Sequence, residues 1–464
     1  MSLLIALGAL ALLMWVAYRG FSVILFAPVA ALLAVLLTDP SAVLPVFSGL
    51  FMEKLVGFVR SYLPVFLLGA VFGKVIELSG FSKAIVAAVL GVIGPSRAVL
   101  SIVLVCNLLT YGGVSLFVVV FAVYPFAAEA FRLAAIPKRL IPGTIALGAF
   151  SYTMDSLPGT PQIQNIIPTT FFNTTTWAAP WLGVIGALFI FGCGMAYLAS
   201  RVRVAKRSGE GYGEGHLLEP VSVVAEQKLP SAWVALIPLA LVGVLNAVFT
   251  QVLERSYPPT TKTSLAGLEH PLVTQISSVK AVWAVELALL VGIISVLLLA
   301  WRPVSTRFAE GSKLAISGAL LAALNTASEY GFGAVIAALP GFAVIKTGLA
   351  AIPNPLVNEA VSVTTLAGVT GSASGGLSIA LAAMSAQFIA AANAAGIPLE
   401  VLHRVAAMAS GGMDTLPHNG AVITLLAVTG LTHRQSYRDI FAITCIKTAA
   451  VFVVIATYVL SGVV

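Results

Sequence analysis

Two stretches of the sequence are nearly identical, and each interrupts a long apolar segment. They read Met-Asp-Ser-Leu-Pro at 154–158 and Met-Asp-Thr-Leu-Pro at 413–417. Proline removes a backbone donor and clashes with the preceding helical turn, and nearby glycines permit the dihedral angles that a break requires. Each stretch therefore predicts a helix that is interrupted rather than continuous.

The composition explains what surrounds these breaks. Hydrophobic residues make up 59% of the 464 residues and charged residues only 9%, against about 25% charged residues in a soluble domain. The chain is therefore expected to be an all-α polytopic membrane protein in contact with lipid. The net charge of +7 comes from short scattered clusters rather than a basic stripe, which argues against nucleic acid as a partner. The three cysteines lie singly, so we expect neither a metal site nor any other cofactor.

A window of about 20 residues per span divides the chain into apolar segments. They lie near 3–18, 21–38, 60–80, 84–108, 114–131, 139–171, 180–200, 231–252, 281–300, 314–338, 342–365, 372–394, 403–431 and 439–463. If 139–171 and 403–431 each cross once, the basic loops all share one side, which should be the cytoplasm. Segment 60–80 then starts outside and segment 314–338 starts inside.

A duplication accounts for that difference. Phe72-Gly73, Gly112-Gly113, Ile136-Pro137 and the first break all recur in the same order about 260 positions later. The sequence thus predicts two inverted-topology repeats with broken helices and re-entrant hairpins. We divide it into N-terminal helices at 1–50, a first repeat at 51–200, a cytoplasmic linker at 201–230, connecting helices at 231–309 and a second repeat at 310–464.

Breaks within a membrane mark a cavity, because unwound backbone survives there only where protein, water or a ligand satisfies it. The half-helix after each break offers free N–H groups to a carboxylate without a buried Arg or Lys. The polar residues expected to bind it are Ser151, Thr153, Ser156, Gly159, Thr160, Gln162 and Asn165 at the first break, and Ser410, Thr415, His418 and Asn419 at the second. The alternative is that they only cap the half-helices or join neighbouring helices.

Glycine-rich turns at 107–115 and 370–376 also lie at corresponding places. They are interpreted as tips of re-entrant hairpins that add Asn107, Thr110, Ser372 and Ser374 to the site, and the alternative is two turns at the membrane surface. Asn325 belongs to a further polar cluster, 325–330, that occurs only in the second half.

Acids inside a span are functional candidates. Asp155, Asp414 and Glu329 are the three proposed to carry the coupling proton. The alternatives are that Asp155 and Asp414 cap half-helices or bind Na⁺, and that Glu329 pairs with a lysine such as Lys346. Four further charged residues near apolar runs, Lys74, Glu77, Arg97 and Lys447, are expected to extend toward water at helix ends.

These residues resemble a known family. The run 141–150 (IPGTIALGAF), its continuation through 157–168, the 328–333 stretch (SEYGFG) and 416–420 (LPHNG) are similar to the gluconate permeases of bacterial inner membranes. The resemblance implies proton-coupled uptake of a small hydroxy-carboxylate such as gluconate, glycerate or 3-hydroxybutyrate. It also implies a homodimer in the inner membrane. The 328–333 and 413–420 stretches favour the 3-hydroxybutyrate branch.

Three classes of function remain open on the sequence. A secondary carboxylate transporter coupled to H⁺, or alternatively to Na⁺, is the first. A cation/proton antiporter is the second, because broken helices with aspartates serve that task too. A membrane enzyme is the third, but the chain has no HExxH, GxSxG or phosphate-loop motif.

Overall fold

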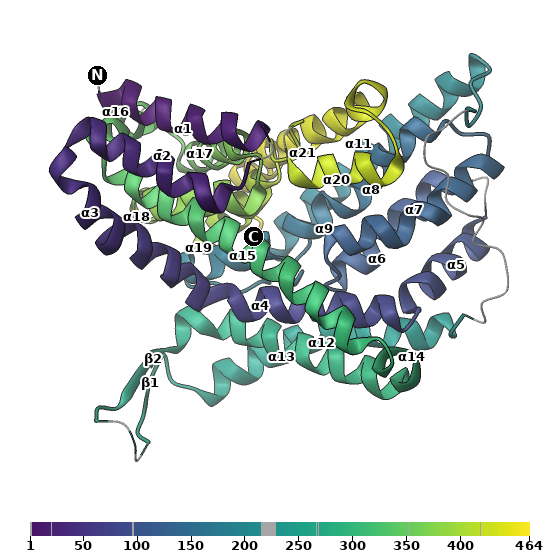
Figure 1. Ribbon diagram of the computed structural model, residues 1–464, viewed down its shortest axis with the longest axis horizontal. Helices are drawn as coiled ribbons and strands as arrows, with labels where there is room; N and C mark the ends of the chain where they lie inside the picture. The colour runs from purple at the N-terminus through teal and green to yellow at the C-terminus, as the bar shows by residue number, and fades with distance from the viewer. Residues whose placement is uncertain are drawn as a thin grey trace.

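The computed structural model describes residues 2–19, 21–94, 97–214, 229–265, 267, 269–350, 352–417 and 419–464. Within these residues the fold is helical apart from one short β-hairpin, and the predicted all-α polytopic membrane class is confirmed (Figure 1). Six helical stretches of the described chain are long and apolar enough to cross a membrane. They are Pro40–Leu78, Pro180–Arg207, Ala232–Ser256, Ile276–Leu299, Ala373–Ala394 and His433–Ser461.

The helices form two series with the same order of long, short and interrupted elements. The first is α4 (Met52–Leu78), α5 (Phe81–Ile93), α6 (Ala98–Tyr111), α7 (Leu116–Leu133), α8 (Ile141–Ala149), α9 (Tyr152–Asp155), α10 (Ile163–Phe172) and α11 (Pro180–Arg207). The second is α15 (Phe308–Ala338), α16 (Pro340–Ala350), α17 (Pro355–Thr370), α18 (Ala373–Ala394), α19 (Leu399–Ser410), α20 (Gly420–Thr429) and α21 (His433–Ser461).

The first helices of the two series, α4 and α15, cross in an antiparallel arrangement (Figure 1). Gly311, near the start of α15, lies against Leu78 at the end of α4, and a Cβ there would come within 2.9 Å of the leucine. Gly331, near the end of α15, lies against Phe51 just before α4 begins. The missing side chains let the two backbones approach closely.

The last helices, α11 and α21, are antiparallel as well. Gly186 of α11 lies beside Val454, whereas Tyr197, further along α11, donates a hydrogen bond to Asp439 near the start of α21 (2.8 Å). Opposite directions of corresponding helices are what inverted halves require. The duplication itself stays a prediction.

The remaining elements cover this pair of series. The N-terminal helices α1 (Ser2–Tyr18) and α2 (Val23–Thr38) pack on each other and on helices of the second series. A 3₁₀ turn η1 (Pro40–Ala42), α3 (Val43–Val46) and a π-helical turn η2 (Phe47–Phe51) lead into α4, and a 3₁₀ turn η4 (Lys138–Leu140) leads into α8. Between the series lie α12 (Ala232–Ser256), α13 (Ile276–Leu299), α14 (Trp301–Ser305) and the antiparallel strands β1 (Thr260–Thr263) and β2 (Leu272–Gln275).

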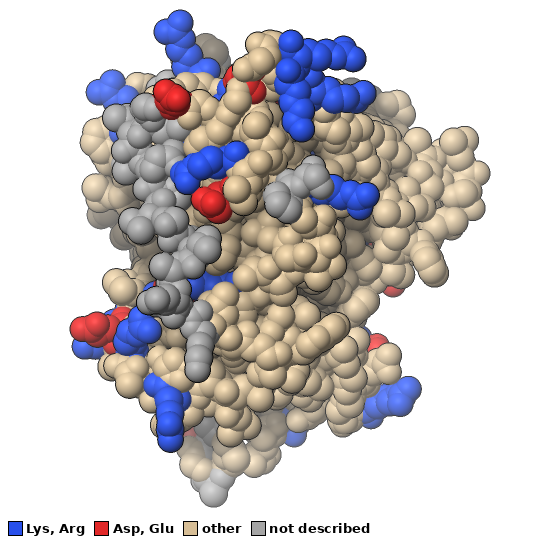
Figure 2. Space-filling model, turned by 90° about the vertical axis from the view of Figure 1, so that its right-hand side faces the viewer, with Lys and Arg blue, Asp and Glu red and all other residues tan. Residues whose placement is uncertain are grey.

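Lys and Arg side chains stand out on one face, the right-hand side of Figure 1, with fewer Asp and Glu among them (Figure 2). The β-hairpin projects from the other side (Figure 1). A face rich in basic residues is the arrangement expected of the cytoplasmic side of a membrane protein.

Two predicted spans are wrong in the same way. Segments 84–108 and 342–365 were each expected to form one helix, but each contains the end of one helix and the start of another. Gly94 has a φ of +83° and ends α5. Asn354 caps α17 through its side chain, and Pro355 begins that helix. Each boundary carries turn residues, Gly94 to Arg97 and Pro353 to Pro355, but a hydropathy window of about 20 residues averages them with the apolar residues on either side.

Candidate functional site

The first predicted break is present, and side chains from other elements satisfy its peptide groups. Helical structure ends at Asp155 and resumes at Ile163. Tyr111 donates to the carbonyl of Pro158 (2.9 Å), and Asn246 of α12 donates to the carbonyl of Gly159 (2.9 Å). Gly159 has a φ of +77°, and a Cβ there would overlap the ring of Trp177. Only glycine fits at this point of the break.

The second break is present as well, between Ser410 and Gly420. Asn419 accepts from the N–H of Val422 (2.9 Å), which caps α20, and donates to the carbonyl of Gly371 (2.7 Å). Tyr437 donates to the carbonyl of Thr415 (3.2 Å). The break therefore rests on both the α17–α18 turn and α21. His418 lies outside the described residues.

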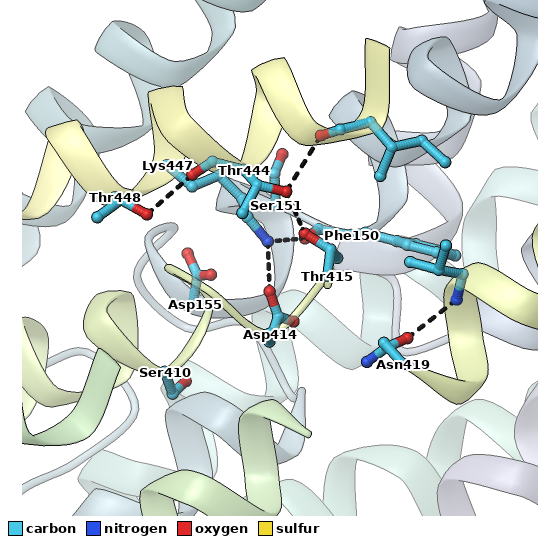
Figure 3. Close-up of polar contacts among 12 residues, drawn as sticks. Phe150, Ser151, Asp155, Ser410, Asp414, Thr415, Asn419, Thr444, Lys447 and Thr448 are labelled. Carbon is cyan, nitrogen blue, oxygen red and sulfur yellow. Dashed lines mark hydrogen bonds and ion pairs between the residues drawn. The ribbon is translucent and has the colours of Figure 1, made fainter. Parts of the chain in front are cut away.

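The two breaks meet at Lys447 of α21 (Figure 3). Its Nζ donates to Oδ1 of Asp414 in the second break and to the carbonyl of Phe150, in the α8–α9 turn just before the first break, both at 2.8 Å. Asp155 faces the same place, because its Oδ2 occupies the position that a Cβ on Gly411 would take. Asp155, Asp414 and Lys447 are 3%, 9% and 2% exposed. A buried ammonium and two buried carboxyls thus lie where the interrupted helices converge.

The prediction for Lys447 was wrong. We expected it to extend to water at a helix end, but it lies at the midpoint of α21, a helix of 29 residues. About 20 Å of helix separates it from either end, so its side chain must find its partner inside the protein. The expectation that helix N-termini alone receive the carboxylate stays a prediction, but the structure places a buried cation beside the breaks that we did not expect. The central position of Lys447 in its apolar segment was the signal in the sequence.

Arg404 of α19 is a second buried cation, and sequence reasoning missed it. It is 0% exposed. Its Nη1 donates to the carbonyl of Asp155 (2.8 Å) and to Oδ1 of Asn165 (3.1 Å), and its Nη2 donates to the carbonyl of Ala178 (2.8 Å). The guanidinium therefore holds backbone on both sides of the first break. A bulkier residue at Gly183 would collide with it.

The side chain of Asn165 is buried against His403 and Arg404 of α19. It donates to the carbonyls of Thr160 (3.0 Å) and Thr176 (2.9 Å), and its Oδ1 accepts from Arg404 and from His403 (3.1 Å). An amide has two donor hydrogens and two acceptor lone pairs. The hydrogen-bonding capacity of Asn165 is therefore fully used inside the protein.

Most of the predicted hydroxyl ligands already donate to nearby backbone. Their acceptors are Leu147 for Ser151, Gly148 for Thr153, Thr153 for Thr160 and Ala407 for Ser410. Ser156 instead donates to Oδ1 of Asp155 (2.7 Å), and Thr415 pairs with the hydroxyl of Thr444. All six are buried. Such hydroxyls shape the breaks, and their oxygens can still accept a hydrogen bond.

The two glycine-rich turns are buried inside the protein rather than on its surface. In the first, the carbonyl of Thr110 accepts from Gln162 (2.7 Å), and Asn107 pairs with Tyr152. In the second, Ser372 caps α18 and Ser374 lies 3.2 Å from the hydroxyl of Thr326. Each turn therefore contacts its own half's break or the long helix before it.

Glu329 occupies a different environment from the two aspartates. It is 3% exposed and lies against Gly375 beside the α17–α18 turn. Its Oε2 has no hydrogen-bond partner among the described residues, and neither does the buried Oδ1 of Asn325, one turn earlier on α15. The side chain of Lys346, the alternative partner, lies outside the described residues. Glu359 of α17 is a buried acid that sequence reasoning missed, and both its oxygens lack a described partner.

A cavity of about 740 Å³ lies elsewhere, between α4, α10 and α15. Aromatic residues line it, among them Tyr62, Phe171 and Tyr330, and Arg60 contributes a charge. None of the predicted site residues is part of its lining.

Comparison with known proteins identifies the class of this molecule. No protein-family model matches the sequence. The chain is 60% identical to the uncharacterized transporter YxjC of Bacillus subtilis (strain 168), over 472 residues that cover 100% of both proteins. The chain belongs to the family of this transporter. Identity at this level over the full length makes the protein a multi-pass membrane transporter.

Two solved structures are similar at low sequence identity. The YdaH transporter of Alcanivorax borkumensis superposes with a TM-score of 0.50 and 14% identity, over 89% of this chain and 88% of its own. MtrF of Neisseria gonorrhoeae gives a TM-score of 0.44 at 13% identity, over 91% of this chain and 85% of its own. The first likeness concerns the fold alone, and neither carries a substrate to this protein.

Proposed function

We propose that the protein is a secondary transporter that imports a small hydroxy-carboxylate together with a proton across the bacterial inner membrane. The observation that carries the proposal is the meeting of two interrupted helices at Lys447. Buried charges and unwound peptide at one place inside a membrane protein are expected of a transport site.

The first break supports anion binding through its backbone. The half-helix α10 begins at Ile163, and no described side chain caps its N-terminus. Its first N–H groups and the positive end of its dipole favour a carboxylate. The corresponding half-helix α20 is capped by Asn419, so the proposal places the substrate's charge nearer the first break.

The resemblance to gluconate permeases supports the substrate class. Hydroxyls and amides around the breaks, such as Ser151 and Thr415, suit the hydroxyl group of a small hydroxy acid. Asp155, Asp414 and Glu329 remain the candidates for carrying the proton, and a homodimer remains the expected assembly.

Uptake into liposomes tests this function. The purified protein is reconstituted, and entry of labelled 3-hydroxybutyrate and gluconate is measured under an imposed pH gradient, an imposed Na⁺ gradient or neither. The proposal predicts accumulation of at least one of them with acid outside, abolished by a protonophore. Accumulation only under a Na⁺ gradient would show that the coupling ion is Na⁺ rather than H⁺. Proton-driven cation flux that does not depend on either acid would reject the proposal in favour of a cation/proton antiporter.

A further inference from the structure

Among the described contacts, the side chain of Lys447 joins Asp414 of the second break to the α8–α9 turn that precedes the first. An ammonium has three donor hydrogens, and two of them are used, on Asp414 and on the carbonyl of Phe150. Its counter-ion Asp414 lies in the non-helical stretch between Gly412 and Pro417, where backbone N–H groups of Asp414 and Thr415 also donate to the carboxylate. Lys447 is therefore held by one ion pair and one carbonyl, and its third donor has no acceptor among the described residues.

Arg404 is not available for the same task. Its guanidinium already donates to the carbonyls of Asp155 and Ala178 and to the amide of Asn165. Withdrawing it would leave the buried carbonyls of Asp155 and Ala178 without this donor, which is costly inside a protein. Of the two buried cations beside the breaks, Lys447 is the one that can change its partner.

We propose that Lys447 is the receptor for the substrate's carboxylate, and that Asp414 holds it only while the site is empty. This inference rests on the proposed function and names the group that recognises the anion. A buried ammonium needs a counter-ion at all times. The substrate carboxylate and Asp414 therefore alternate as partners of one lysine.

The charge of the site links this exchange to a proton. Around Asp414, the described titratable or charged groups are Lys447 and Tyr437 of α21 and Asp155 of the first break. Arg404 of α19 lies beside Asp155 in turn. With both carboxylates ionised, the two aspartates balance Lys447 and Arg404. A bound monocarboxylate adds one negative charge, and a proton that forms an O–H bond on Asp414 removes it.

Two consequences follow from this balance. The anion and the proton bind together, because either one alone leaves a net charge buried among apolar helices. The substrate enters as carboxylate, the proton is taken from water on the outer side, and both are released inside. Transport then moves no net charge and responds to the pH difference rather than to the membrane potential.

Binding to the detergent-solubilised protein tests the exchange. 3-Hydroxybutyrate and gluconate are each titrated into the protein by calorimetry at pH 6 and pH 8. Binding to the wild type is expected to weaken at pH 8. K447M should weaken binding about 30-fold or more at both pH values, as loss of a buried charged partner does. D414N should bind at least as tightly as the wild type at pH 6 and lose the pH dependence.

Because either single change leaves a buried charge unpaired, the double variant K447M/D414L provides the folding control. Replacing both members of a buried pair by apolar residues is commonly neutral for stability, so this variant should melt near the wild type and still fail to bind. Normal binding by K447M, or loss of binding by D414N, would overturn the inference. A wild type that transports no hydroxy acid would instead reject the proposed function.

Discussion

Arg404 is expected to hold the first break in place, and replacing it by methionine tests that role. The change removes the donors to two buried carbonyls, those of Asp155 and Ala178. Each orphaned acceptor costs about 1–3 kcal/mol, and relief from burying the guanidinium offsets part of that. Asn165 keeps its contact with His403. We expect a net destabilisation of about 3 kcal/mol, at the middle of the range for buried polar networks.

Thermal unfolding in detergent, followed by intrinsic fluorescence, measures the effect. The expected fall in apparent melting temperature is about 5 °C. The matched control is R203M, because Arg203 is an exposed arginine on α11 that donates one long hydrogen bond, to the carbonyl of Ala199 (3.4 Å). The melting temperature of R404K should lie between those of R404M and the wild type, because lysine keeps the charge but not the planar set of donors. Equal melting of R404M and R203M would refute the reasoning.

Three further substitutions have expected outcomes. G159A should lose uptake and about 1–3 kcal/mol of stability, because the new methyl overlaps Trp177 at a positive φ; uptake equal to wild type would mean that the break is not rigid. D439N should lower stability by about 3 kcal/mol, since it removes the buried partner of Arg201 (2.8 Å); unchanged melting would contradict this. E210Q should lower the free energy of unfolding by less than about 1 kcal/mol at pH 7. A hydrogen bond from Arg139 lowers the pKa of Glu210 in the folded protein, so the stability that Glu210 adds is lost as the pH falls toward 4 and below. The difference in unfolding free energy between variant and wild type should therefore narrow over that range.

The helix breaks could be predicted from sequence because their causes are local. Pro158 and Gly159 stop a helix whatever surrounds them, and so do the residues from Gly411 to Pro417. The membrane class follows from apolar content in the same way. The ends of α5 and α16 were missed because a hydropathy window of about 20 residues spans both short breaks, although the Gly94-Pro95 and Pro353-Asn354-Pro355 stretches are local turn signals.

The partners across the breaks were harder to predict, because they depend on which faces meet. Lys447 and Arg404 lie on helices of the second series and contact the carbonyls of Phe150 and Asp155 in the first. The sequence around either cation does not predict which carbonyls will accept its hydrogen bonds. The position of Lys447 at the middle of an apolar span does exclude a helix end. Any charged residue at such a position is expected to have its partner inside the protein.

The most direct measurement is an experimental structure of the protein with its transported hydroxy acid bound, determined by cryo-electron microscopy in lipid. The account predicts density for the carboxylate within hydrogen-bonding distance of the Lys447 ammonium, between the two breaks, with Asp414 turned away from it. Density in the aromatic cavity beside Tyr62 and Tyr330, with the Lys447–Asp414 pair intact, would contradict the claim that the interrupted helices form the transport site.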